Sequence, residues 1–149
     1  MMTMKTILFT CIALCATALV PLRAAGEAVV GGPKGGRLLE TEPLKAEFFV
    51  TPERKVEVIF YDAAMKPTAP TTQTVAVTAE APSGRTKLDF EKTPTGFLST
   101  TPLPDGDGYR VVAQVRPAAD AKPQNFRITL AMHTCAECDR TEYACTCGH

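Results

Sequence analysis

The residues best suited to chemistry lie together at the C-terminal end of the chain. Six side chains that can bind a metal fall within the last 17 residues, in the pattern H-x-C-x2-C-x6-C-x-C-x-H: His133, Cys135, Cys138, Cys145, Cys147 and His149. Two thiolates spaced as C-x2-C can face one ion, and the C-x-C pair can complete a tetrahedron. Thiolates prefer soft and borderline cations, so the pattern predicts a site for zinc or another thiophilic ion such as Cu(I), with the histidines as substitute ligands.

Two disulfides are the main alternative for these four cysteines. An exported protein meets an oxidising compartment, where thiols usually pair. All four lie close together in the sequence, however, and the widest bridge, from Cys135 to Cys147, closes a loop of only 13 residues. Such bridges would fasten the tail to itself and to no distant strand. We therefore expect a metal to order the tail, and we keep a disulfide-closed interaction module without metal as the alternative.

Enzymatic chemistry finds little support elsewhere in the chain. A redox C-x-x-C motif needs a thioredoxin-like βαβ context, and haem attachment needs C-x-x-C-H, whereas Asp139 follows Cys138 here. A serine hydrolase would need a histidine near Ser83 or Ser99, yet both histidines are in the tail. We therefore expect a protein that is not an enzyme.

The N-terminal segment has the features of an export signal. A short basic start precedes an apolar run of 14 residues over 7–20, and small residues follow at Ala24 and Ala25. This pattern predicts a signal peptide over residues 1–25, and a periplasmic or secreted mature protein without a membrane anchor. Cleavage would remove Cys11 and Cys15 and leave the four tail cysteines.

The charge balance argues against nucleic acid as a partner. The whole chain of 149 residues carries 16 basic and 16 acidic groups. Without Lys5 and Arg23 the mature form has 14 basic groups against 16 acidic ones. A nucleic-acid binder should instead carry a basic excess.

The body that must position the tail has the alternation of β-strands. Apolar and polar residues alternate over 56–61, 74–79, 88–90, 109–116 and 125–132, and Pro, Gly and Asp-Gly turns separate these runs. About seven short antiparallel strands indicate an all-β fold, an immunoglobulin-like β-sandwich over residues 38–132. The Gly-rich segment 26–37 predicts a flexible leader, and residues 133–149 form the Cys/His metal-binding tail, anchored by Tyr143.

Four stretches carry a resemblance that covers most of the mature chain: Gly35–Leu39, Thr101–Pro104, Ala136–Cys138 and Glu142–Cys147. The most specific part is the tail ECDRTEYACTC. On these residues the chain resembles small exported bacterial proteins that are similar to accessories of heavy-metal efflux systems of the resistance-nodulation-division type. The resemblance implies a periplasmic metal-binding accessory that sequesters or delivers cations, with a heavy-metal efflux complex as its partner.

Overall fold

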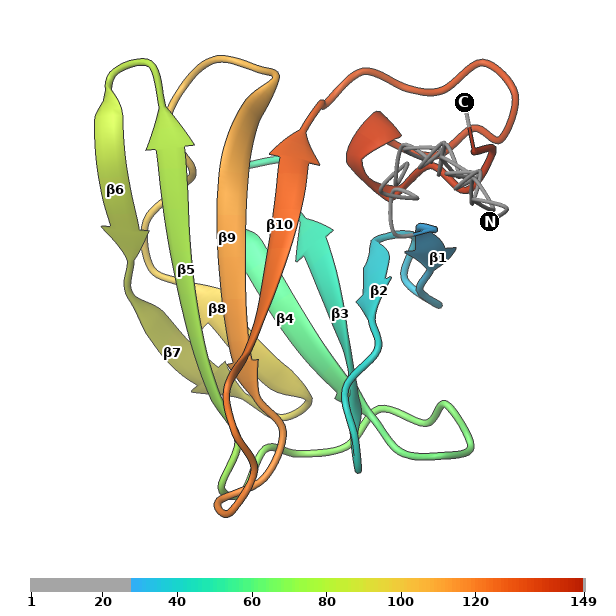
Figure 1. The fold of residues 1–149 in the computed structure, drawn as a ribbon, viewed down its shortest axis with the longest axis vertical. Coiled ribbons are helices and arrows are strands. Elements are labelled where there is room, and N and C mark those ends of the chain that lie inside the picture. The colour runs from blue at the N-terminus through green and yellow to red at the C-terminus, as the bar shows by residue number, and fades with distance from the viewer. Residues whose placement is uncertain (1–27, 149) are drawn as a thin grey trace, which may run out of the picture.

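The computed structural model describes residues 28–148, which form an all-β chain with two antiparallel sheets (Figure 1). The predicted signal peptide over 1–25 lies outside these residues, as does His149. One 3-10 turn, η1 (Glu142–Ala144), follows the last strand. The strands within 28–148 are β1 (Val30–Gly31), β2 (Arg37–Leu39), β3 (Lys45–Val50), β4 (Val56–Tyr61), β5 (Thr74–Ala81), β6 (Gly84–Leu88), β7 (Phe90–Thr93), β8 (Gly96–Ser99), β9 (Tyr109–Arg116) and β10 (Gln124–Leu130).

The two sheets pack face to face in a sandwich-like arrangement. The larger sheet has the strand order β1-β2-β3-β4-β8-β7, and the smaller sheet has the order β10-β9-β5-β6. Strands β9 and β10 alternate between buried and more exposed residues along their length, which confirms the predicted alternation. The inward side chains of both sheets form one apolar core, whose largest fully buried members include Phe48, Phe60, Leu88, Ile128 and Leu130.

The strand count differs from the predicted number of about seven. The structure has ten strands within residues 28–148. The run predicted over 88–90 is two strands, because the chain leaves the smaller sheet at Leu88 and joins the larger one at Phe90. Strand β8 gives no clear alternation in the sequence, because it has only four residues and begins with a glycine. The immunoglobulin-like type of the sandwich stays a prediction.

The segment predicted as a flexible Gly-rich leader over 26–37 is instead folded from β1 onward. Its turn wraps around the carboxylate of Glu47, which is fully buried on β3. The Oε1 atom accepts the backbone N–H of Gly36 at 2.7 Å and that of Lys34 at 3.1 Å. A Cβ at Gly32 would lie 2.1 Å from the Glu47 Cδ atom, so only glycine allows this approach. The glycine-rich turn therefore encloses the side-chain carboxyl of Glu47. The folded body thus begins before residue 38.

No helix found among residues 28–148 combines the length and the apolar character needed to cross a bilayer. Beyond β10 the chain runs over the edge of the sandwich formed by β10 and β2, which η1 contacts (Figure 1). This edge holds every tail cysteine that the sequence singles out.

Candidate metal centre

The first two cysteines lie in a tight loop that begins at Thr134, four residues after the end of β10. Thr134 and Thr141 form an antiparallel bridge, and the N–H of Cys135 donates to the carbonyl of Arg140 at 2.8 Å. The N–H of Asp139 returns to the carbonyl of Cys135 at 3.1 Å. Asp139 has φ of 56°, a left-handed conformation that aspartate tolerates better than most residues. The loop thus reverses direction immediately after the C-x2-C pair.

The turn η1 carries the chain from this loop to the second pair of cysteines. Its first two N–H groups donate to carbonyls in the segment that follows β10. The N–H of Glu142 donates to the carbonyl of His133 at 2.9 Å, and the N–H of Tyr143 donates to the carbonyl of Ala131 at 3.0 Å. The N–H of Cys145 closes the turn on the carbonyl of Glu142 at 3.0 Å. The 3-10 geometry therefore places Cys145 and Cys147 against the first loop instead of leading them away from it.

Tyr143 anchors the tail on the sandwich, which confirms the role expected from the sequence. Its side chain is buried, and its hydroxyl accepts the backbone N–H of Val50 at 2.9 Å. Its ring meets Phe48 edge to face, with centroids 5.8 Å apart and an interplanar angle of 84°. Burial raises the pKa of the Tyr143 hydroxyl, which therefore remains protonated. The segment between the two cysteine pairs is thus part of the core.

The four sulfur atoms converge on one point. They all lie within 4.8 Å of one another, and we call this group the sulfur cluster: Cys135, Cys138, Cys145 and Cys147. Two of the sulfur pairs are 138–145 at 3.6 Å and 135–147 at 3.9 Å, far beyond a disulfide bond length of about 2.05 Å. Four sulfurs around zinc at about 2.3 Å stand about 3.8 Å apart in a tetrahedron. The cluster therefore has the spacing of a four-thiolate metal site.

Backbone N–H groups aim at two of the sulfurs. The N–H of Cys147 donates to the Cys145 Sγ at 3.4 Å, and the N–H of Arg140 donates to the Cys138 Sγ. In each case the donor lies two residues after the cysteine. The Arg140 N–H lowers the pKa of the Cys138 thiol to about 7. In contrast, the sulfur of Cys138 raises the pKa of the Cys147 thiol. The site thus stabilises the thiolate form first at Cys138. A bound cation would also stabilise the thiolate forms of the other three cysteines.

The cluster has a buried side and an open side. Cys135 and Cys145 are only 5% and 8% exposed, whereas Cys138 and Cys147 are partly exposed. An ion at the centre would therefore be held from below by two buried sulfurs. An incoming ligand could reach it at the two outer ones.

The histidines behave differently from the cysteines. His133 does not join the group of ligand atoms formed by the sulfur cluster. It is two-thirds exposed, with Nδ1 at 4.0 Å from a carboxylate oxygen of Asp107 and Nε2 at 3.9 Å from one of Glu142. His149 lies outside the described residues, so its predicted role as a ligand stays a prediction.

Arg140 is a neighbour of the site that sequence reasoning did not single out. Its guanidinium lies against β1, where a Cβ at Gly31 would come within 2.6 Å of the Cζ atom. A larger residue at position 31 would therefore push the end of the arginine side chain away from β1. The glycine-rich composition of this segment was the available signal, and its partner in the tail could not be read from the sequence.

No protein-family model, no curated protein and no solved structure matches this chain.

Proposed function

We propose that this protein is an exported accessory that binds a thiophilic cation through the sulfur cluster and sequesters or delivers it. The observation that carries the proposal is the convergence of four unbonded sulfur atoms within 4.8 Å, on a segment fastened to the core by Tyr143. Tetrahedral all-sulfur sites suit zinc and related ions. Zn(II) is thus our first candidate and Cu(I) the second.

Delivery, as distinct from a purely structural role, is supported by the open side of the cluster. A structural zinc is normally enclosed by its four ligands. Here Cys138 and Cys147 are partly exposed, and a thiolate from an acceptor could replace one of them while the buried pair keeps its hold. The core residues of the two sheets pack without any member of the sulfur cluster. The sandwich should therefore stay folded after the ion leaves.

The cellular setting extends this proposal. The basic start and apolar run over residues 1–25 support export to the periplasm or beyond, and the tail motif supports association with a heavy-metal efflux complex. Such a protein would act by binding and exchange, without catalysing a reaction.

The test is native mass spectrometry of the mature protein purified from its own compartment, before and after treatment with a chelator. We expect one bound ion and four free thiols after its removal. The variant with all four cluster cysteines changed to Ser should bind none. Thr146→Ala, in the same loop, should bind like the parent chain. His133→Ala should also bind one ion, because the imidazole lies outside the sulfur cluster.

A disulfide-closed interaction module is the alternative, and the geometry gives it a specific form. Sulfurs that lie 3.6 Å and 3.9 Å apart would pair as 138–145 and 135–147, giving one loop inside the other. Protein that is two mass units lighter per bridge, unaffected by chelator and metal-free as purified would support the alternative and reject the metal site. Peptide mapping would then identify the two bridges.

A further inference from the structure

The edge of the sandwich formed by β5, β6 and β7 is incomplete. Strand β6 pairs with β5 only between Val77↔Leu88 and Ala81↔Gly84. The first residues of β5, Thr74–Ala76, pair with β9 on one side. On their other side, no strand of the described chain pairs with them. Strand β7 is likewise the outermost strand of the larger sheet.

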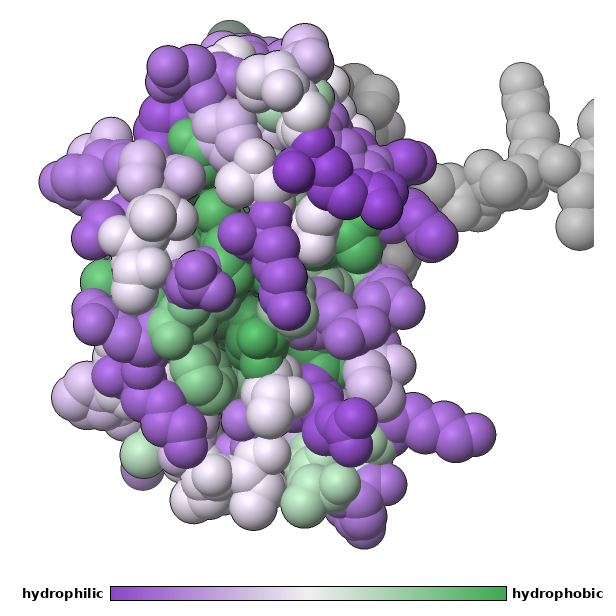
Figure 2. Space-filling view, turned by 90° about the vertical axis from the view of Figure 1, so that its left-hand side faces the viewer, coloured by the Kyte–Doolittle hydropathy of each residue, from purple (hydrophilic) through white to green (hydrophobic). Residues whose placement is uncertain are grey.

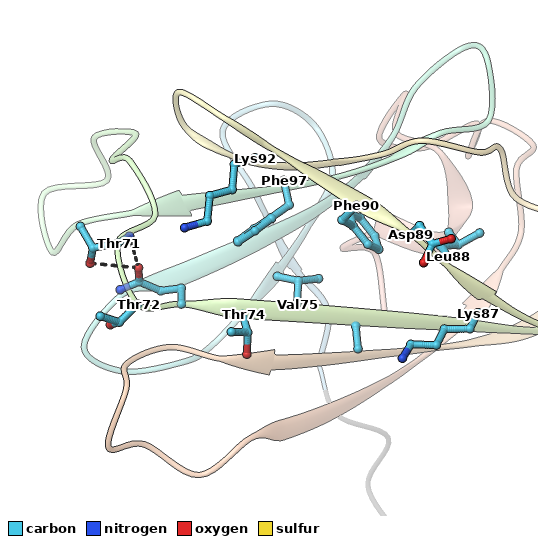
Figure 3. Close-up of a pocket in the computed structure, with 12 residues that line it drawn as sticks. Thr71, Thr72, Thr74, Val75, Lys87, Leu88, Asp89, Phe90, Lys92 and Phe97 are labelled. Carbon is cyan, nitrogen blue, oxygen red and sulfur yellow. Dashed lines mark hydrogen bonds between the residues drawn. The ribbon is translucent and has the colours of Figure 1, made fainter.

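The break between β6 and β7 causes this gap. After Leu88 the chain changes sheets at Asp89, so that Phe90 pairs with Ser99 of β8. If β6 continued in its own sheet, it would lie beside Thr74–Ala76. The place of that missing strand is an open groove, which we call the edge groove (Figure 3).

The edge groove has an apolar floor. Its volume is about 440 Å³, within the range of pockets that hold ligands. Leu88 and Phe97 are buried beneath it, whereas Val75 and Phe90 remain partly exposed. Figure 2 faces this edge and shows apolar surface at its centre with hydrophilic side chains around it. Apolar surface ringed by polar groups is typical of an interaction site.

The charges around the groove favour an acidic occupant. Lys87 and Lys92 line it from two different strands and are exposed, and Asp89 is the one acidic residue among the lining side chains (Figure 3). Gln73, at one end, is already occupied, because its amide donates to the carbonyl of Pro117 at 3.1 Å and its oxygen accepts the N–H of Thr71 at 2.7 Å. The two ammonium groups of the lysines thus outnumber the single carboxylate of Asp89 along the groove.

We propose that the edge groove binds an extended segment of a partner protein, with alternating apolar and acidic residues, as an added strand along Thr74–Ala76. Main-chain hydrogen bonds to an open strand edge supply affinity, and alternate side chains supply specificity. The apolar side chains of the segment would cover Val75 and Phe90. Its carboxylates would approach Lys87 and Lys92.

This inference goes beyond the proposed metal function and does not depend on it. The tail packs on β2 and β10, whereas the edge groove lies between β5 and β7. In the larger sheet β2 and β7 lie toward opposite ends of the strand order, and in the smaller sheet β10 is an edge strand from which β5 is separated by β9. A partner could therefore hold the protein at the groove while the sulfur cluster remains open for exchange.

The test uses the isotopically labelled mature protein and two pools of blocked hexapeptides. One pool alternates Asp or Glu with Val, Ile or Phe, and the other has Lys or Arg in place of the acidic residues. We expect the acidic pool to shift the amide resonances of Thr74–Ala76 and of residues 87–92, and to slow amide exchange along that part of β5. The best acidic hexapeptide should bind roughly tenfold more weakly to the double variant Lys87→Glu and Lys92→Glu.

The controls separate this surface from general electrostatic attraction. The double variant Lys66→Glu and Arg127→Glu changes the net charge equally at exposed cations that do not line the groove, and it should bind like the parent chain. The spectra of both variants report folding directly. The proposal is overturned by equal binding of the basic pool, by shifts confined to another surface, or by no shift at millimolar peptide. Self-association through the same residues would also overturn it, because the occupant would then be a second copy.

Discussion

Replacing Tyr143 by Phe tests whether the metal-binding tail is fastened to the sandwich as the structure indicates. The change keeps the ring that packs edge to face on Phe48 and removes only the hydroxyl. That hydroxyl accepts the N–H of Val50, and both residues are buried, at 4% and 6% exposure. The substitution therefore leaves one buried donor without an acceptor.

The expected cost follows from that single donor. A buried polar group that loses its partner destabilises a protein by about 1–3 kcal/mol. Converted at about 1.4 kcal/mol per factor of ten, this corresponds to an equilibrium change of roughly 5- to 150-fold. Tyr143→Leu should cost more than the Phe variant, because it also removes the aromatic pair, worth about 0.5–1.5 kcal/mol.

Two measurements would detect the loss of stability caused by Tyr143→Phe. Urea unfolding followed by circular dichroism should show a lower midpoint with an unchanged slope. Amide hydrogen exchange should show faster exchange at Val50, by a factor within the same range. Tyr109→Phe is the matched control, because its hydroxyl donates to the carbonyl of Pro104 in a separate loop. It should leave exchange at Val50 unchanged. An unaltered midpoint together with unaltered Val50 protection in Tyr143→Phe would refute the anchoring role.

Three further predictions concern ionisable groups. In metal-free protein, Cys138 should be the first thiol alkylated by iodoacetamide, and its rate should fall about tenfold per pH unit below its pKa of about 7, because the reactive thiolate is lost. Glu47→Gln should lower the free energy of unfolding by about 1.5–3 kcal/mol in urea titrations, because the amide replaces a charged acceptor of several N–H and O–H donors. Stability should fall as the pH rises above about 10, because burial raises the pKa of Tyr61, so that the unfolded state loses its proton first.

Each of these predictions has a clear contrary result. Equal alkylation rates at all four thiols would contradict the effect of the Arg140 N–H on Cys138. A Glu47→Gln variant as stable as the parent chain would show that the buried carboxylate is not the centre of the glycine turn. For the alkaline transition, the slope of stability against pH should be reduced in Tyr61→Phe. An unchanged slope would assign the effect to other groups.

The sequence predicted the grouping of the four cysteines better than it predicted their surroundings. Cysteine spacing suffices to suggest a chelating group, because ligand chemistry depends on residue type and a few intervening positions. The position of the cluster on the sandwich could not be predicted, because it depends on contacts such as Tyr143 with Val50, which are 93 residues apart. His133 shows the limit of spacing alone, since its ring lies between two carboxylates instead of joining the sulfurs.

The fold followed the alternation wherever the strands have one buried face. Strands β9 and β10 could be predicted in this way, since every second residue points to the core. The pattern failed at β1 and β2, because glycines carry no hydropathy signal and their order depends on Glu47, a buried carboxylate that alternation places in solvent. It also failed at Asp89, because a change of sheet preserves the period of two across the break.

The contact between Arg140 and Gly31 has a practical consequence for anyone who prepares this protein. It brings β1 against a side chain of the loop that carries Cys138, while Cys147 lies at the other end of the described residues, in the sulfur cluster. A polyhistidine tag after residue 149 would follow the cluster directly in the sequence, and its imidazoles would compete with the thiolates for the same ions. An affinity handle inserted in the exposed hairpin at Pro82–Ser83, between β5 and β6, would keep the purification chemistry at a distance.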